Sequence, residues 1–346
     1  MMKIDIKSLL LSELEEEIKN IGEKGFRAKQ IYSWLHEKNA KSFAEMSNLS
    51  NNLREKLSNK SFISELKILK KMKSRQDDTT KYLFQLENDT IIESVLMKYS
   101  FGNSVCVSSQ AGCRMGCKFC ASTIGGIERN LTSAEMLSQV YEIQSELGER
   151  ISNVVIMGSG EPLDNYENTL KFIRILNSEE GLKIGQRHIT LSTCGLVDKI
   201  AELQQENLQI NLAISLHAPN DEIRKKLMPI AKTYSMAELI SACNSYSNAT
   251  KRRITYEYAL IHGVNDSRES ALELAKKLSN TLSHVNLIPV NNVDEQNFRK
   301  SSKENILAFS EILKKSNVET TIRRELGSDI NAACGQLRKS YLERGV

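Results

Sequence analysis

The chain has 346 residues, of which 40% are hydrophobic and 26% are charged, and its formal net charge is +4. This composition is typical of a globular protein that is long enough for one large domain with an appendage or for two domains. No apolar run approaches the roughly eighteen residues of a membrane span, and nothing at the N-terminus resembles a signal peptide, so we expect a cytoplasmic protein. The odd number of cysteines, seven, argues against a disulfide scaffold. The mild positive charge permits a nucleic-acid partner without demanding one.

The N-terminal part of the chain predicts a small helical module. Apolar residues recur at three- and four-residue spacing in "IKSLLLSELEEEIKNI" and "FRAKQIYSWLHEK", which the turn "GEKG" separates. From residue 63 to residue 109 the period changes to two in "TKYLFQLE", "TIIESVLMKY" and "SVCVSSQ", which predicts β-hairpins. We therefore divide the chain into a helical accessory domain at 1–60, a β-hairpin extension at 61–105 and a main domain at 106–346.

Strand-like and helix-like segments alternate beyond Leu131. Strands are predicted at "SNVVIMG", "RHITLST", "INLAISLHA", "RRITYEYALI" and "SHVNLIPV", with helical patterns such as "SAEMLSQVYEIQSEL" between them. Such alternation implies right-handed βαβ units around a parallel sheet. About six units fit, which is fewer than a closed eight-unit barrel needs, so the pattern favours an open partial barrel or a doubly wound sheet. In both folds ligands bind at the C-terminal ends of the strands, where "GSGEP", "STCG", "SLHAP" and "PVNN" occur.

Three cysteines, Cys113, Cys117 and Cys120, lie within eight consecutive residues of "SSQAGCRMGCKFCAST". Thiolates bind zinc or iron–sulfur clusters, and a structural zinc site normally takes four protein ligands, usually as two separated pairs. A cubane cluster held by three thiolates leaves its fourth iron open to a small molecule. The triplet therefore favours an iron–sulfur cluster. The alternative at this point is a zinc knuckle that borrows a distant Cys or His.

The triplet and the alternating pattern after it resemble the radical SAM superfamily, and more narrowly the RlmN/Cfr family of radical SAM RNA methyltransferases. Five motifs in order carry the resemblance: "SSQAGCRMGCKFCAST", "MGSGEP", "SLHAPNDEIRKKLMPI", "HVNLIPVN" and "DINAACGQL". "GEKGFRAKQIYSWL" is also similar to that family's N-terminal accessory domain. The resemblance implies an α/β fold, a partial (β/α)6 radical SAM barrel with an N-terminal helical accessory domain and a β-hairpin extension. It also implies a [4Fe-4S] cluster on the three cysteines and two molecules of S-adenosylmethionine (SAM) per turnover.

The family uses the strand ends to bind SAM, which assigns the corresponding residues here. Gly160 and Glu161 offer close backbone approach and a carboxylate for the ammonium group of SAM. The resemblance adds the remaining residues of the pocket: Ser192, Ser215, Leu216, His217 and Asn291. One departure is Ser159, where many members of the family have Met.

Two cysteines outside the triplet, Cys106 and Cys334, match the family's reactive pair. The C2 carbon of adenine is electrophilic and cannot attack a sulfonium methyl group, so a radical route is needed. The resemblance implies that Cys334 accepts a methyl group, that a 5′-deoxyadenosyl radical activates it, and that a covalent RNA adduct forms. Cys106 would then form a disulfide with Cys334 and release the base. Glu93 matches the proposed proton acceptor, although strand alternation alone is equally consistent with an outward-facing surface residue.

Basic runs supply a candidate RNA surface at residues 67–75 in "KILKKMKSR", at 251–253 in "KRR" and at 323–324 in "IRRE". Each run alone is equally consistent with a solvated basic face. Together with the helical module they predict an RNA footprint. Because a modified base must leave its stack, we expect structured RNA with an adenosine that can be extruded.

The leading function is methylation of C2 of an adenosine in 23S rRNA at the peptidyl-transferase centre, and the resemblance admits tRNA beside the anticodon as a second substrate. "CRMGCKFCAST" favours the RlmN branch. The Cfr branch, which methylates C8 of the same rRNA adenosine, more often reads "CATG" after the last ligand. A non-catalytic RNA-binding iron–sulfur protein is a further alternative, and the reactive thiol pair argues against it. We expect a flavodoxin- or ferredoxin-like electron donor, no membrane partner and a monomer.

Overall fold

The structure, a computed structural model, describes residues 3–290, 298–332 and 335. The α-helices in these ranges are α1 (Leu11–Asn20), α2 (Phe26–His36), α3 (Asn51–Lys60), α4 (Ser133–Leu147), α5 (Tyr166–Asn177), α6 (Val197–Gln205), α7 (Asp221–Leu227), α8 (Met236–Thr250), α9 (Arg268–Leu278) and α10 (Lys303–Lys315). The first strands are β1 (Ile4–Asp5), β2 (Ser61–Phe62), β3 (Lys67–Lys73), β4 (Thr80–Gln85), β5 (Ile91–Tyr99), β6 (Gly102–Cys106), β7 (Gln110–Gly112) and β8 (Ile127–Asn130). The later strands are β9 (Ile151–Ile156), β10 (Ile189–Thr193), β11 (Asn211–Ser215), β12 (Ile254–Leu260), β13 (Ser283–Pro289) and β14 (Glu319–Ile322).

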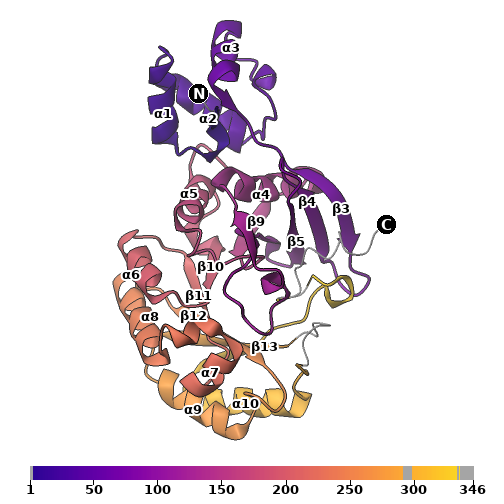
Figure 1. Ribbon diagram of the computed structural model, residues 1–346, viewed down its shortest axis with the longest axis vertical. Coiled ribbons are helices and arrows are strands. Elements are labelled where there is room, and N and C mark those ends of the chain that lie inside the picture. The colour runs from indigo at the N-terminus through magenta and orange to yellow at the C-terminus, as the bar shows by residue number, and fades with distance from the viewer. Residues whose placement is uncertain (1–2, 291–297, 333–334, 336–346) are drawn as a thin grey trace.

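Helices α1 to α3 form a separate module at one end of the molecule (Figure 1). Most of their apolar side chains are buried, although Phe26 on α2 is exposed, and polar contacts join the module to α4 of the main body. The ammonium group of Lys7 donates to the carbonyl of Ser64 at 2.6 Å and to the hydroxyl of Ser138 on α4 at 3.2 Å. Nδ1 of His36 lies 2.8 Å from the hydroxyl of Tyr141, also on α4. The module is therefore docked through buried polar groups.

One ten-stranded sheet forms the main body, in the order β14-β13-β12-β11-β10-β9-β6-β5-β4-β3. The strands from β6 to β14 run parallel, and β3, β4, β5 and β6 are joined in antiparallel pairs. Helices link the successive parallel strands. The connections contain, in chain order, α4, α5, α6, the pair α7 and α8, α9, and α10. The predicted (β/α)6 arrangement with a hairpin extension is thus confirmed, because six helical crossovers connect seven parallel strands.

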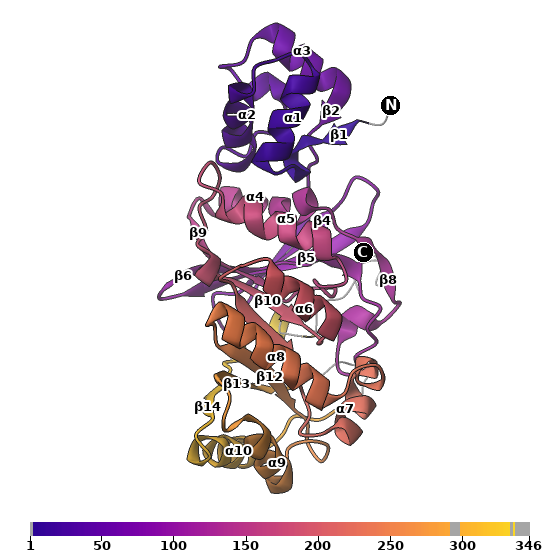
Figure 2. The ribbon, with the colours of Figure 1, turned by 90° about the vertical axis from the view of Figure 1, so that its left-hand side faces the viewer.

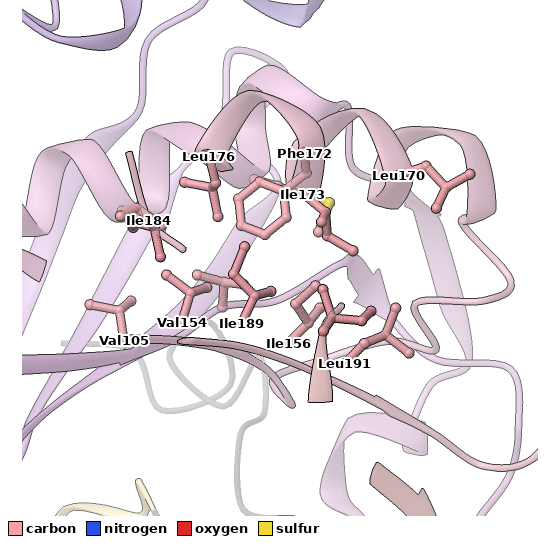
Figure 3. Close-up of a cluster of buried hydrophobic side chains, with 14 of the residues drawn as sticks. Val105, Val154, Ile156, Leu170, Phe172, Ile173, Leu176, Ile184, Ile189 and Leu191 are labelled. Atoms are coloured by element: carbon pink, nitrogen blue, oxygen red, sulfur yellow. The ribbon is translucent and has the colours of Figure 1, made fainter. Parts of the chain in front are cut away.

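The helices from α4 to α10 cover the outer face of the curved sheet (Figure 2). Parallel strands buried in this way carry near-continuous apolar residues. Figure 3 shows how α5 seals this face, with Phe172 and Leu176 pointing toward Val154 and Ile189 of the strands. All four of these side chains are fully buried.

The hairpin strands continue the same sheet instead of forming a separate layer, because β6 pairs with β5 on one side and with β9 on the other. The register places Lys81 opposite Val95, and Val95 opposite Cys106. Opposed residues of paired strands share one face, so these three side chains form a row across the sheet. The division of the chain at residue 105 falls within β6 and stays a prediction.

Within the described ranges, none of the helices is both long and apolar enough to span a bilayer.

Candidate active site

The cysteine triplet lies in a loop that follows β7 and packs against the end of α7. Two glycines with positive φ shape this loop, Gly112 at 73° and Gly116 at 70°. A Cβ atom on Gly112 would lie 2.1 Å from the carbonyl oxygen of Gly126, so only glycine fits there. The amide of Lys118 donates to the carbonyl of Leu227 at 2.8 Å, which ties the loop to α7.

The three thiols have the surroundings that a cluster requires. Cys113 and Cys117 are buried, and Cys120 is half-buried. Burial raises the pKa of Cys113 to about 12 and raises that of Cys117 further, and the neighbouring thiols of the triplet add to both shifts. Buried thiolates need a positive partner, and iron supplies one. The donor set therefore fits a metal group.

The described residues contain no three His, Cys, Asp or Glu side chains that converge tightly enough to hold a single metal ion. In a cubane each cysteine binds a different iron, so the thiolates do not need to share one coordination centre. The spacing of the triplet therefore fits a cubane cluster.

A pocket adjoins the cysteine loop at the C-terminal ends of β9, β10 and β11, and we call it the strand-end pocket. The predicted site residues that line it are Cys117, Cys120, Gly160, Glu161, Ser192, Ser215 and His217. Leu216 does not line it; its side chain is fully buried and its amide donates to the carbonyl of Glu257 at 3.0 Å. Asn291 lies outside the described residues.

Glu161 is fixed at the wall of the strand-end pocket. Its carboxylate accepts the amide of Leu163 at 3.0 Å and the amide of Cys194 at 2.7 Å. Burial raises the pKa of Glu161, and these hydrogen bonds only partly offset that effect. An ammonium group in the pocket would favour the ionised carboxylate. A Cβ atom on the neighbouring Gly160 would lie 2.6 to 2.8 Å from Gln110, which explains the glycine.

His217 presents a neutral ring to the same pocket. Burial, with a smaller contribution from Arg224, lowers the pKa of His217 to about 3. Its Nδ1 accepts the amide of Ala259 at 2.9 Å, so Nε2 carries the proton of the neutral ring. The ring contacts Phe119 edge-on, with 4.6 Å between the centroids. His217 therefore offers a hydrogen-bond donor without a charge.

A second pocket, the thiol pocket, shares a wall with the first. It contains Cys106 together with Val95, Met97 and Ala332. The two pockets have several lining residues in common: Cys120, Met157, Gly158, Ile288, Arg323 and Gly335. The Cys106 side of the site is therefore next to the cysteine loop.

Cys106 is buried. Cys334 lies outside the described residues. The nearest described residues on either side of it, Ala332 and Gly335, both line the thiol pocket. The carbonyl of Gly335 accepts the amide of Ala121, directly after the cysteine loop, at 2.8 Å.

Glu93 is buried rather than exposed on the surface of its strand. It lies two residues from Val95 on β5 and so shares the face that carries Cys106. One carboxylate oxygen lies 3.4 Å from the ammonium nitrogen of Lys81. Glu93 lines neither of the two pockets described above but a third one, with Ser122 among its neighbours.

Three residues at the site escaped the sequence analysis: Lys81, Gln110 and Arg224. Lys81 is the partner of Glu93, and Gln110 accepts the amide of Glu161 at 2.9 Å. Arg224 is fully buried and donates to the carbonyl of Cys194 at 2.7 Å, which holds the end of β10. Arg224 and Gln110 lie within quoted motifs, but only their partners, distant in the sequence, reveal what they hold.

The three basic runs have different surroundings in the structure. Lys67, Lys70 and Lys73 are exposed on β3, which forms one edge of the sheet. Arg253 instead pairs with Glu319 on β14, and residue 323 lines both pockets. Residue 251 and residue 324 are exposed as well, but β3 carries the longest row of exposed lysines among the three runs.

Comparison with known proteins identifies the class of the protein. Residues 107–275 match the model of the radical SAM superfamily, and residues 4–63 match the N-terminal domain of ribosomal RNA large subunit methyltransferases. The chain is similar to a crystal structure of a radical SAM methyltransferase from Sphaerobacter thermophilus, at 43% identity and a TM-score of 0.92 over 97% of this chain and 99% of the other. The fold and the cysteine loop thus define a radical SAM enzyme, whose class uses a [4Fe-4S] cluster and SAM.

Curated relatives identify the family within this class. The chain is 55% identical to the probable dual-specificity RNA methyltransferase RlmN of Lachnoclostridium phytofermentans over 99% of this chain and 96% of the relative. It is 56% identical to that of Clostridium novyi over 98% of both chains. The chain belongs to the RlmN family of radical SAM RNA methyltransferases.

Proposed function

We propose that the protein methylates C2 of an adenosine in 23S rRNA at the peptidyl-transferase centre, and C2 of the adenosine beside the anticodon in tRNA. The observation that carries this proposal is the shared wall of the two pockets. A site for SAM at the strand ends and a site for reactive thiols at Cys106 adjoin each other through Cys120 and Gly335. The names of the relatives, dual-specificity RNA methyltransferases, support both substrates.

The residues of the two pockets have distinct roles in the proposed mechanism. Cys113, Cys117 and Cys120 would hold the cluster, and Glu161 would bind the ammonium group of SAM. When bound, the cluster and SAM supply the methyl group that Cys334 accepts and the 5′-deoxyadenosyl radical that removes a hydrogen atom from it. Ser192, Ser215 and His217 would bind and orient SAM through polar groups at the strand ends.

The thiols and Glu93 then complete the transfer. The methylene carbon on the sulfur of Cys334 bonds to C2 of adenine, which gives a covalent adduct between protein and RNA. Glu93 would take up the proton that C2 loses, and the cluster would be the acceptor for the one electron that the adduct must also lose. The thiolate of Cys106 attacks the sulfur of Cys334, so the bond from that sulfur to carbon breaks as the disulfide forms, and a proton from solvent completes the methyl group of the base as it leaves. A flavodoxin- or ferredoxin-like protein would supply the electrons, and the enzyme would act as a monomer.

The test of the regiochemistry is mass spectrometry of rRNA and tRNA from cells with and without the gene. We expect 2-methyladenosine to disappear from both RNAs when the gene is deleted. Loss of 8-methyladenosine instead would indicate Cfr-type methylation. No change in either nucleoside would indicate an RNA-binding iron–sulfur protein without this activity.

The test of the thiol roles is a pair of variants purified from cells and treated with ribonuclease. Cys106→Ala should retain RNA covalently on a denaturing gel, because the resolving thiol acts only after the bond to the base exists. Cys334→Ala should retain none, because it has no carbon to add. Covalent RNA on the Cys334 variant would exclude that residue as the methyl carrier.

A further inference from the structure

The segment that follows β14 crosses the sheet from one edge toward the other. β14 is the edge strand beside β13, and β3 is the opposite edge. Residues 327–331 nevertheless contact the turn between β3 and β4, at residues 74–79. These contacts are made by the last described residues before Cys334.

Two carboxylates make this contact in a crossed pattern. Asp77 of the turn accepts the amide of Gly327 at 2.9 Å, and Asp329 of the crossing segment accepts the amide of Arg75 at 2.9 Å. Asp329 also accepts the hydroxyl of Ser74 at 2.7 Å. The turn and the crossing segment thus each supply one carboxylate, which accepts a backbone amide of the other. Hydrogen bonds of this charged kind are stronger than those between neutral groups.

Lys81, at the start of the next strand, joins the same segment to the site. Its ammonium group donates to the carbonyl of Asn331 at 3.1 Å and lies 3.4 Å from the carboxylate of Glu93. The side chains of Lys81 and Glu93 are each only 5% exposed. One buried cation therefore contacts both the proposed proton acceptor and a backbone carbonyl three residues before Cys334.

The chain is held again just after Cys334, where the carbonyl of Gly335 accepts the amide of Ala121. The two fixed points are four residues apart, which is a short span of chain. Fixing both ends of a short segment restricts where a side chain between them can reach.

We propose that Asp77, Asp329 and Lys81 are positioning residues that fix the chain at residues 327–331, just before Cys334, and that coupling of radical formation to RNA methylation depends on this anchoring. We call these contacts the hairpin clasp. The proposal rests on the function proposed above, in which Cys334 carries the methyl group. None of the three residues touches the strand-end pocket or the thiol pocket. The clasp acts through the backbone that it holds.

The test uses the full-length enzyme with its cluster and compares Asp329→Ala with Asp78→Ala. Asp329 is exposed, so its replacement does not endanger folding. Asp78 is an exposed carboxylate in the same turn that makes none of the clasp contacts, so it is a matched control for charge and place. The quantity measured is methylated RNA formed per 5′-deoxyadenosine, with iron content and melting temperature recorded for each variant.

We expect this ratio to fall about tenfold or more in Asp329→Ala, because small misplacement of a reacting group is costly. Iron content and melting temperature should match those of Asp78→Ala, which keeps the wild-type ratio. Asp77→Ala should lower the ratio similarly, and the double variant should lose little more than the worse single variant, since both break one contact. A lowered melting temperature with an unchanged ratio would mean that the contact is only structural.

The outcomes separate the two proposals. One outcome is that peptide mass spectrometry finds a methyl group on wild-type Cys334, but Asp329→Ala and Asp78→Ala form the same amount of methylated RNA per 5′-deoxyadenosine. The clasp proposal is then wrong and the proposed function stands. If wild-type Cys334 is never methylated during turnover, the proposed function itself is wrong.

Discussion

Glu161 illustrates how single side chains make the strand-end pocket selective. Two backbone amides point at its carboxylate, yet burial still raises its pKa. The two hydrogen bonds orient the carboxylate but do not fully offset the cost of burying its charge. A cationic ligand would offset the remainder. His217 is neutral for the corresponding reason, since burial lowers its pKa to about 3. The pocket therefore suits a ligand that brings its own positive charge.

Replacing the carboxylate of Glu161 should weaken the binding of a positively charged ligand. We expect Glu161→Gln to weaken SAM binding about tenfold to a hundredfold, the range for losing a charged hydrogen-bond partner. Equilibrium dialysis under anaerobic conditions measures the affinity, and iron content serves as the control for an intact cluster. Unchanged affinity for SAM would remove Glu161 from the binding site.

His36 makes stability depend on pH. Burial, followed by the charge of Lys7, lowers the pKa of His36 to about 3, below the ordinary value of 6.5. Between these values the unfolded chain binds the proton and the folded chain does not. The contribution is therefore fully present above pH 6.5 and is lost as the pH falls toward 3, with a limiting slope of about 1.4 kcal/mol per pH unit.

His36→Gln should remove that slope from the free energy of unfolding. Anaerobic denaturant titrations at pH 7, 6 and 5 measure it. His188→Gln is the control, because His188 is exposed. If both variants keep the wild-type pH dependence, the neutral buried His36 is not its source.

Local spacing is sufficient to place some of the predicted site residues, although their roles stay predictions. The spacing of Cys113, Cys117 and Cys120 puts them in one loop, and Glu161 lies a few residues past the end of β9. Lys81 and Arg224 could not be found in this way, because their partners lie on other strands and the sheet brings them together. Leu216 was predicted to line the pocket but points into the core, as alternation beside Ser215 and His217 requires.

At the scale of elements, β3 stands out as an edge strand that carries exposed lysines. It ends the sheet, and its exposed lysines deter edge-to-edge pairing with another chain. The same charges suit RNA phosphates. Hairpins were predicted from the period of two, whereas β14 was missed because four partly polar residues give too short a pattern.

We expect Lys67→Ala combined with Lys73→Ala to weaken RNA binding and to reduce the slope of log K against log salt by about 1 to 2, because each phosphate contact releases counterions. The matched control is Lys314→Ala with Lys315→Ala on α10, which removes equal charge elsewhere. Filter binding at several salt concentrations gives the slopes. Equal slopes in the two double variants would show that β3 does not contact RNA.

At the scale of the whole molecule, the ten-stranded sheet is complete before the reactive segment begins. Its last strand, β14, ends at Ile322, and the clasp starts at Gly327. The three cysteines of the cluster loop and Glu161 also precede that point. The parallel sheet was predictable from alternation, but the crossing of residues 327–331 was not, since no local pattern encodes a contact with a turn some 250 residues away.

A chain that ends at residue 326 should therefore fold, bind iron and cleave SAM without methylating RNA. Some loss of stability is expected, because Val95 and Met97 lose their packing against Ala332 and Ile330. Iron content and 5′-deoxyadenosine production measure the retained functions. Failure of the shortened chain to hold iron would show that the last segment is part of the folding core.

The same order along the chain has a consequence during translation. The strands and the cysteine loop leave the ribosome before the crossing segment does, and domains fold as they emerge. The cysteine loop and the strands up to β13 can be outside the exit tunnel while the later residues are still inside it. A radical-generating centre would then exist briefly without the thiol that receives its product. Cells would avoid this state by loading the cluster only after the chain is released from the ribosome. An iron assay of ribosome-bound chains stalled at residue 326 tests this idea.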